Sequence, residues 1–386
     1  ALGRAAGLYK RVVWVLPVRT SIGNLPLDGF KSFLITKRGY SQQELTDLTL
    51  DGKYITGTLR GVPLTITNLD DLSLDGESAI IDIDLSFFTG MAGAAIGFGT
   101  GTAPALGFLR ELRLKSVETH LVTVTLSNTT RTVPVDFRYL GMVLSEALED
   151  PTALGQSPPV KLSIAADAER AFLEERTAAA DSIYRILVET NPLEPGFHYS
   201  LAVTSGLLRN AEDCTAHLDE AYRLDPVYVQ GLFQVASMLA ANGNLSTAEE
   251  LVSRSAIREA FEDNELSYGT GIMYMMAGVP DKALPLLQEA ARFDQDDFRL
   301  QNLIYMMSRD AGDQEGMIGA LEKLSEIDSE MVNRRMPWVY RELGVLYEKR
   351  GDRQRAGRMY RQYLEAVPSD STAAELRVKI RELSKM

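Results

Sequence analysis

The sequence of 386 residues contains few of the residue types on which many catalytic and metal sites depend, with one cysteine, three histidines and two tryptophans. A single cysteine excludes an internal disulfide. The chain also lacks the motifs Gly-x-Ser-x-Gly, His-Glu-x-x-His and Cys-x-x-Cys, which mark common hydrolases, zinc proteases and redox proteins. We therefore expect no catalytic residue, no cofactor and no metal, and we predict that the protein is not an enzyme.

Basic residues are outnumbered as well, because 40 Lys and Arg stand against 53 Asp and Glu, a net charge of −13. Residues 1–150 carry −2 of this charge and the remainder carries −11. An acidic surface repels phosphate backbones, so nucleic acid is not expected as the main ligand.

Charge is absent altogether from residues 85–109, a stretch rich in glycine. Its length would suffice for a membrane span, and Gly93 and Gly97 form a small-xxx-small pair. Six glycines and Pro104 dilute its hydrophobicity, however. A phosphate-binding loop is a second alternative, but the glycines do not complete the pattern G-x-G-x-x-G. We favour a mobile apolar loop that packs on a partner, and we do not favour membrane association.

Short runs of branched and aromatic residues dominate residues 1–148 and predict β-strands. They lie at 12–16, 33–36, 54–59, 64–67, 79–85 and 120–126. Asp51-Gly52 and Asp75-Gly76 stand between such runs and suggest hairpins, and Arg60-Gly61 suggests another turn. We predict an antiparallel β-rich domain, a sandwich or a barrel. The polar residues 149–160, with Pro158-Pro159, predict an extended linker and a domain boundary.

A repeat of about 34 residues fills positions 161–370. One register of mostly small residues marks it, at Ala180, Cys214, Ala248, Ala283, Met317 and Ala356, with spacings of 34, 34, 35, 34 and 39. A period of this length is typical of stacked helical hairpins, which form an α-solenoid. The period predicts about six hairpins, of which the first lacks a clear turn and could instead be one long helix. An amphipathic stripe at Leu376, Ile380 and Leu383 predicts a capping helix in residues 371–386.

The last unit resembles a tetratricopeptide repeat (TPR). The matching residues, in order, are Leu343-Gly344, Tyr347, Gly351-Asp352, Ala356, Tyr360 and Pro368, whereas Tyr363 stands where the family usually has Ala. This resemblance covers residues 161–386 and implies a right-handed superhelix that binds peptides or other proteins.

The resemblance also implies which residues line the inner groove of such a superhelix. They are mostly apolar here, and we predict a partner-binding groove formed by Tyr199, Val203, Phe233, Tyr268, Ile272, Met275, Asn302, Met306, Trp338 and Arg341. Such a lining suits a partner helix or strand with an apolar face. The alternative is that several of these side chains only pack between repeats. Some TPR proteins hold a peptide carboxylate with Lys, Asn and Arg, but no Lys stands at these places, so we do not predict that mode.

Other candidate sites have simpler interpretations. Cys214 and His217 are two ligands, fewer than zinc usually needs, and Cys214 occupies the small-residue place of the repeat. Asp82 and Asp84 share one side of a predicted strand and could form half of a calcium site or an acid pair. We interpret them as the solvated side of that strand, opposite Ile81 and Ile83.

Together these features predict a non-enzymatic scaffold or a structural subunit of a larger assembly, in which the groove holds a partner protein. The alternative is an enzyme or a glycan-binding module with its site in the β-rich domain, for which the helical repeats recruit substrate. No leader with a charged start and an apolar core remains at the N-terminus, so we expect either that a leader has been removed or that the numbering starts from a processed or trimmed form. The compartment stays open, with a bacterial periplasm or envelope slightly favoured over the cytoplasm.

Overall fold

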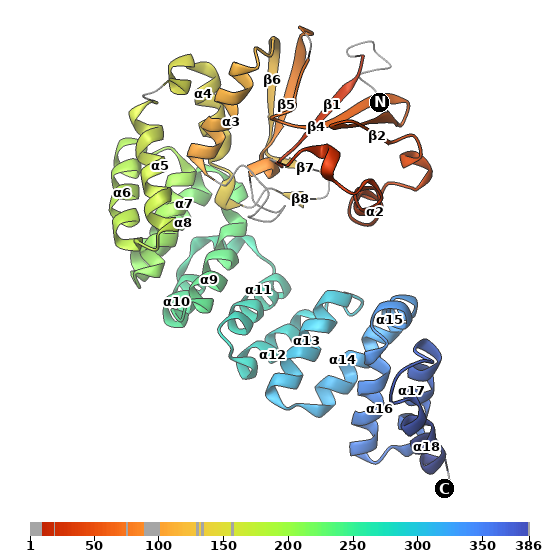
Figure 1. The fold of residues 1–386 in the computed structure, drawn as a ribbon. Coiled ribbons are helices and arrows are strands. Elements are labelled where there is room, and N and C mark those ends of the chain that lie inside the picture. The colour runs from red at the N-terminus through yellow and green to blue at the C-terminus, as the bar shows by residue number, and fades with distance from the viewer. Residues whose placement is uncertain are drawn as a thin grey trace. The chain divides into compact units, whose positions relative to one another are not determined.

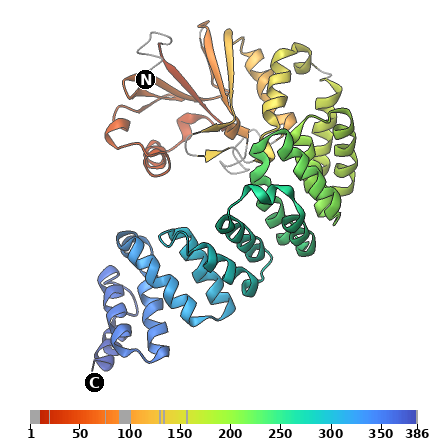
Figure 2. The same ribbon diagram turned by 180° about the vertical axis from the view of Figure 1, so that it is seen from behind.

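The computed structural model describes residues 10–18, 20–74, 76–88, 101–128, 131–132, 135–155 and 158–384. It divides into two compact units, Ala1–Leu201 and Ala202–Met386. The first holds the strands and the second holds only helices (Figures 1 and 2). A β-rich region followed by paired helices confirms the predicted fold class.

The first unit is built on a four-stranded sheet in the order β1-β4-β3-β2. Its strands are β1 (Val12–Leu16), β2 (Thr49–Asp51), β3 (Tyr54–Leu59) and β4 (Val62–Asn68). The predicted turns at Asp51-Gly52 and Arg60-Gly61 join β2, β3 and β4 as antiparallel neighbours. Arg60 and Gly61 have φ values of 51° and 75°, which are the positive angles that a two-residue hairpin needs.

The predicted antiparallel arrangement is wrong, because the four-stranded sheet is mixed and a separate two-stranded sheet is parallel. β1 pairs with β4 in parallel, and β5 (Ala79–Asp84) pairs in parallel with β6 (Thr119–Thr125). β4 and β5 do not pair, so no hairpin forms around Gly76, and Asp75 lies outside the described residues. Parallel neighbours need a long crossover, commonly a helix. Here α3 (Thr102–Leu114) lies in the crossover between β5 and β6.

Helix α3 also corrects the loop predicted at residues 85–109. Leu85–Phe88 forms a 3-10 turn, η3, whose Leu85 and Phe88 are fully buried, and α3 begins at Thr102. Residues 89–100, with most of the glycines, lie outside the described residues. Within the described parts of the chain, no helix is both long and apolar enough to cross a membrane.

Alternation along β1 explains how the four-stranded sheet is covered. Trp14 and Leu16 pack into the cluster that contains Leu34 of α2 (Leu27–Arg38). Val13 and Val15 pack into a second cluster with α3 and α4 (Leu140–Glu149). Because successive side chains of a strand point to opposite sides, one strand contributes to two cores. The remaining short elements of this region are η1 (Ile22–Asn24), η2 (Gln43–Leu45), β7 (Ser127–Asn128), β8 (Arg131–Thr132) and η4 (Val135–Phe137).

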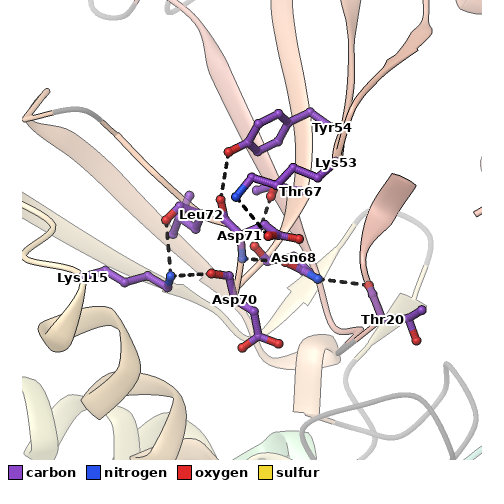
Figure 3. A network of polar contacts seen from close by, with 9 residues as sticks. All are labelled: Thr20, Lys53, Tyr54, Thr67, Asn68, Asp70, Asp71, Leu72 and Lys115. Carbon is purple, nitrogen blue, oxygen red and sulfur yellow. Dashed lines mark hydrogen bonds and ion pairs between the residues drawn. The ribbon is translucent and has the colours of Figure 1, made fainter. Parts of the chain in front are cut away.

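A polar network around the buried Asn68 fixes the turn that follows β4 (Figure 3). Asn68, which is 1% exposed, accepts the backbone N–H of Asp71 at 2.8 Å and donates to the carbonyl of Thr20 at 3.0 Å. Lys115, just after α3, donates to the carbonyl of Asp70 at 2.8 Å. Lys53 lies 3.1 Å from the Asp71 carboxylate. These polar groups form hydrogen bonds and ion pairs with one another, so we interpret the network as stabilising the fold rather than as a binding site.

Residues 149–160, predicted as an extended linker, contain a short folded element, η5 (Pro151–Leu154), before α5 (Val160–Leu173) begins. Asp150 caps η5 by accepting the backbone N–H of Thr152 at 2.9 Å. Arg110 of α3 donates to the carbonyl of Leu154 at 3.1 Å. The division between the units falls later in the chain, inside α7 (Pro195–Leu207).

Glu169 shows why the first helical pair, α5 and α6 (Thr177–Thr190), belongs to the first unit. Its partly buried carboxylate accepts the backbone N–H of Thr102 at 2.7 Å and the Thr102 hydroxyl at 2.5 Å. A carboxylate suits this place because the first N–H groups of α3 lack partners within the helix. Gly101 has a φ of 105°, and a Cβ there would lie 2.4 Å from the Glu169 carboxylate. Desolvation by burial raises the pKa of Glu169.

Helical pairs continue through the second unit and confirm the predicted TPR-like hairpins. Among the described residues the pairs are α5/α6, α7/α8, α9/α10, α11/α12, α13/α14 and α16/α17. The first repeat, α5/α6, therefore consists of two helices and not of one long helix. The helices of this unit, with two 3-10 turns, are α8 (Ala211–Leu224), η6 (Pro226–Gln230), α9 (Gly231–Ala241), α10 (Leu245–Arg254), η7 (Ala256–Ala260), α11 (Asp263–Met276), α12 (Pro280–Ala290), α13 (Phe298–Ala311), α14 (Gln314–Ile327), α15 (Ser329–Arg335), α16 (Trp338–Arg350), α17 (Arg353–Ala366) and α18 (Ala373–Leu383).

The small-residue register is buried at every repeat. Ala180, Cys214, Ala248, Ala283 and Ala356 are 0% exposed and Met317 is 7% exposed. Small residues at this register let the two helices of a pair approach closely. The longer spacing of 39 between Met317 and Ala356 has a structural cause, because the extra helix α15 stands between α14 and α16.

Candidate functional site

The first helices of successive pairs carry apolar side chains at matching positions of the repeat. On α11, Tyr268, Ile272 and Met275 follow the spacing i, i+4, i+7, which places them along one side of the helix. Met306 on α13 lies 34 positions after Ile272. Because the positions correspond from one pair to the next, these side chains lie on corresponding sides of their helices.

Three of the apolar side chains predicted for the groove reach the surface. Tyr268 is 40% exposed, Met306 is 37% exposed and Trp338 on α16 is 38% exposed. Met276, 48% exposed, lies four residues after Ile272 and is not among the residues predicted for the groove. The i, i+4 spacing from Ile272 was the signal that could have found it. We define the apolar face as Phe233, Tyr268, Ile272, Met275, Met276, Met306 and Trp338.

Members of the apolar face pack closely against neighbouring residues. The ring of Phe233 on α9 covers Gly269 of α11, where a Cβ would lie 2.4 Å from the ring. The ring centroids of Phe233 and Phe261 are 5.0 Å apart. Further along, the Trp338 ring lies 5.5 Å from the ring of Tyr305, which is itself buried. The rings are therefore held in place by their neighbours, which reduces the conformational entropy that a partner must remove on binding.

Asn302 and Arg309 on α13 and Arg341 on α16 are polar residues of the same helices. The amide of Asn302 on α13 lies 4.0 Å from the sulfur of Met306. The exposed Arg341 guanidinium lies 5.8 Å from the centre of the Tyr363 ring. Arg309 pairs with Asp310 at 3.1 Å. Desolvation, followed by the charge of Glu342, raises the pKa of Tyr305, so that phenol stays neutral at ordinary pH.

Two residues predicted for the groove are buried. Tyr199 is 5% exposed, lies in the first unit and donates its hydroxyl to the carboxylate of Asp136. Val203, at the start of the second unit, is 9% exposed. Periodicity places both at inner positions of a helix, but it does not show what covers them.

The competing candidate sites keep their structural interpretation. Cys214 is fully buried, and desolvation raises the pKa of its thiol to about 12, so it stays protonated and poorly reactive. His198 is 5% exposed, with Nε2 3.0 Å from the carbonyl of Pro192. Asp82 accepts hydrogen bonds from Thr123 and Thr125 on the exposed side of β5 and β6. Within the described residues, no cluster of three or more potential metal ligands occurs.

A scan with protein-family models and a search of curated proteins gave no match. The solved structures to which the chain is similar are TPR proteins. One is YrrB, described as a TPR protein with an unusual peptide-binding site, at 18% identity over 50% of this chain and 97% of that one, with a TM-score of 0.33. Another is pilF of Pseudomonas aeruginosa, at 12% identity over 57% and 97% of the two chains, with a TM-score of 0.29. A third is TTC0263, a thermophilic TPR protein of Thermus thermophilus, at 19% identity over 59% and 100%, with a TM-score of 0.22.

Proposed function

We propose that this protein is a non-enzymatic interaction scaffold, or a structural subunit of a larger complex, that holds a partner protein on the apolar face of its helical pairs. The observation that carries this proposal is the exposure of Tyr268, Met306 and Trp338 on the first helices of the α11/α12, α13/α14 and α16/α17 pairs. Large apolar side chains are costly to leave in water, and neighbouring ones at a surface commonly mark a binding site.

The chemistry of the apolar face indicates what it holds. Its side chains are aromatic, aliphatic and thioether groups, with Asn302 and Arg341 as polar neighbours. A helix or strand with an apolar face fits such a lining, because its anchors can enter between the side chains while its polar side stays in water. Methionines at 275, 276 and 306 allow the surface to adjust to the anchor that enters.

The experiment that tests this compares what two double variants capture. Tyr268→Ala with Met306→Ala removes two exposed anchors, and each truncation of a central anchor costs about 2 kcal/mol of binding. We expect proteins captured from native extract by the wild type, and identified by mass spectrometry, to be lost with this variant. Its melting temperature should change little, because both side chains are partly in water already.

The matched control is Leu208→Ala with Phe293→Ala. Leu208 follows α7 and is 44% exposed, and Phe293 follows α12 and is 67% exposed, so both are exposed apolar residues outside the apolar face. The control should retain the partners. Equal capture by the wild type and by both variants would contradict the proposal, as would equal loss from both variants.

A further inference from the structure

Charge is distributed unevenly within the second unit. Residues 202–348 contain 25 acidic and 12 basic side chains, a net charge of −13. Residues 349–386 contain five acidic and ten basic side chains, a net charge of +5. The helices α17 and α18 therefore form a basic region in an acidic protein, and long-range electrostatics favours an anionic partner at that place.

A shallow pocket of about 600 Å³ lies between these two helices. We call it the α17–α18 pocket, and its lining is Arg361, Leu364, Glu365, Arg377, Ile380 and Arg381. Leu364 and Ile380 are half-buried and pack against the core of the unit, so they provide a fixed apolar floor. Three guanidinium groups and one carboxylate surround this floor, which leaves a local excess of positive charge.

Two arginines of the pocket differ from Lys379 of α18 in their ion pairing. Lys379 pairs with Glu348 at 2.7 Å, and Arg353 donates to the carbonyl of Glu382 at 2.9 Å. Arg361 and Arg377, by contrast, have no carboxylate within ion-pair distance among the described residues. Arg377 and Arg381 are also four residues apart on α18, where like charges repel each other. An anion bound in the pocket would relieve this repulsion.

We propose that the α17–α18 pocket binds an acidic segment of a partner protein, with an apolar side chain on the floor of Leu364 and Ile380 and its carboxylates against the guanidinium groups. A planar guanidinium can hold a carboxylate through two parallel hydrogen bonds. The apolar floor favours such a peptide over a nucleic acid. A long polyanion would also extend over the acidic remainder of the unit, where it would be repelled.

This site does not depend on the apolar face. The apolar face is formed by α9, α11, α13 and α16, whereas the pocket is lined only by α17 and α18. The two sites can therefore be tested with separate variants, and failure of one leaves the other intact.

The first test measures binding of a short fluorescein-labelled peptide of leucine and glutamate by fluorescence anisotropy. We expect Arg361→Glu and Arg377→Glu each to weaken binding about tenfold, because each removes a charge-assisted contact and adds repulsion. Glu365→Gln should strengthen binding about threefold, because it removes the only carboxylate of the pocket lining. Since all three side chains are exposed, the variants should fold, which circular dichroism would verify.

Arg358→Glu is the matched control. Arg358 is an exposed arginine on the same helix, α17, and is not among the residues that line the pocket. We expect its substitution to change binding less than about twofold, since an exposed charge outside the pocket is screened by salt. If Arg358→Glu weakens binding as much as Arg361→Glu, general charge attraction explains the binding and the proposal is overturned.

Changing the probe tests the class of ligand. A peptide in which serine replaces leucine should bind at least about tenfold more weakly, because it cannot use the apolar floor. Undiminished binding of the serine peptide, or no binding of the leucine peptide at physiological salt, would overturn the proposal. So would tighter binding of phosphatidylserine vesicles or of single-stranded DNA than of the leucine peptide.

Discussion

The sheet of the first unit and the helical pairs of the second differ in how far apart in the sequence their contacting residues lie. In the sheet, Val12 of β1 pairs with Leu64 of β4, and Ile81 of β5 pairs with Val122 of β6. In the second unit each helix packs mainly against helices that lie one or two places away in the sequence. Non-local pairing makes a structure cooperative, whereas neighbour-to-neighbour packing divides stability among the repeats. A steric clash introduced at one residue should therefore destabilise the whole sheet in the first unit, but only the neighbouring helices in the second unit.

The largest effect is expected from Gly57→Ala in β3. A Cβ at Gly57 would lie 2.4 Å from the carbonyl oxygen of Asp47 and 2.9 Å from its carbonyl carbon, and backbone atoms cannot easily move aside. We expect the free energy of unfolding of the first unit to fall by about 3 kcal/mol. Urea denaturation would measure this loss, and hydrogen exchange would show faster exchange throughout β1, β3 and β4.

The control for this prediction is Gly107→Ala in α3, where a Cβ meets nothing within 4 Å. Alanine is a better helix former than glycine, so this substitution should stabilise the protein by up to about 1 kcal/mol. If faster exchange in Gly57→Ala remained confined to β2 and β3, the sheet would not be cooperative and the comparison would fail.

A smaller and more local effect is expected from Gly344→Ala in α16. A Cβ there would lie 2.5 Å from the Tyr360 ring, which is 1% exposed and donates its hydroxyl to Glu348 at 2.8 Å. The clash should cost about 3 kcal/mol, and the better helix propensity of alanine offsets about 1 kcal/mol of it. Hydrogen exchange should accelerate in α16, α17 and α18, while α9 to α12 keep their protection.

Gly319→Ala in α14 is the matched control, because a Cβ at that position meets nothing within 4 Å. It should leave exchange in α16 to α18 unchanged or slower. Uniform acceleration through all the helical pairs in Gly344→Ala would show that the second unit unfolds as one body.

The smallest effect concerns the pH dependence of the first unit. Burial raises the pKa of Glu169 above its ordinary value of 4.5, and Thr102, Tyr139 and Tyr184 are the polar and titratable groups around it. The folded state therefore binds this proton more tightly than the unfolded state. Its contribution to stability is complete below pH 4.5 and is lost as the pH rises toward the raised value.

Glu169→Gln should remove this part of the pH dependence. Between pH 4.5 and neutrality, we expect the melting temperature of the first unit to rise in the variant relative to the wild type, with the difference growing as the pH increases. Asp167→Asn, an exposed carboxylate on the same helix, is the control and should follow the wild type. A parallel course of the wild-type and Glu169→Gln curves would contradict this role of Glu169.

Local features of the chain were predictable. Patterns within a few tens of residues predict the period of the repeat, its helical hairpins, the turns at Gly52 and Gly61, and the strands at 12–16, 54–59 and 79–84. The run at 33–36 was predicted as a strand and lies within α2, because tertiary packing of Leu34 overrides the preference of branched residues for strands. The exposed residues of the apolar face, apart from Met276, were predicted from their positions in the repeat.

The order of residues alone is enough to predict the helical repeat, because each helix packs against neighbours close in sequence and that contact appears in its own periodicity. Only the tertiary structure decided the parallel pairings of β1 with β4 and β5 with β6, since the partners lie far apart in the chain. It also decided that the first helical pair joins the β-rich unit, through a carboxylate of α5 that satisfies the start of α3. Contacts between distant residues leave no periodic pattern, and so they cannot be read from the order of residues alone.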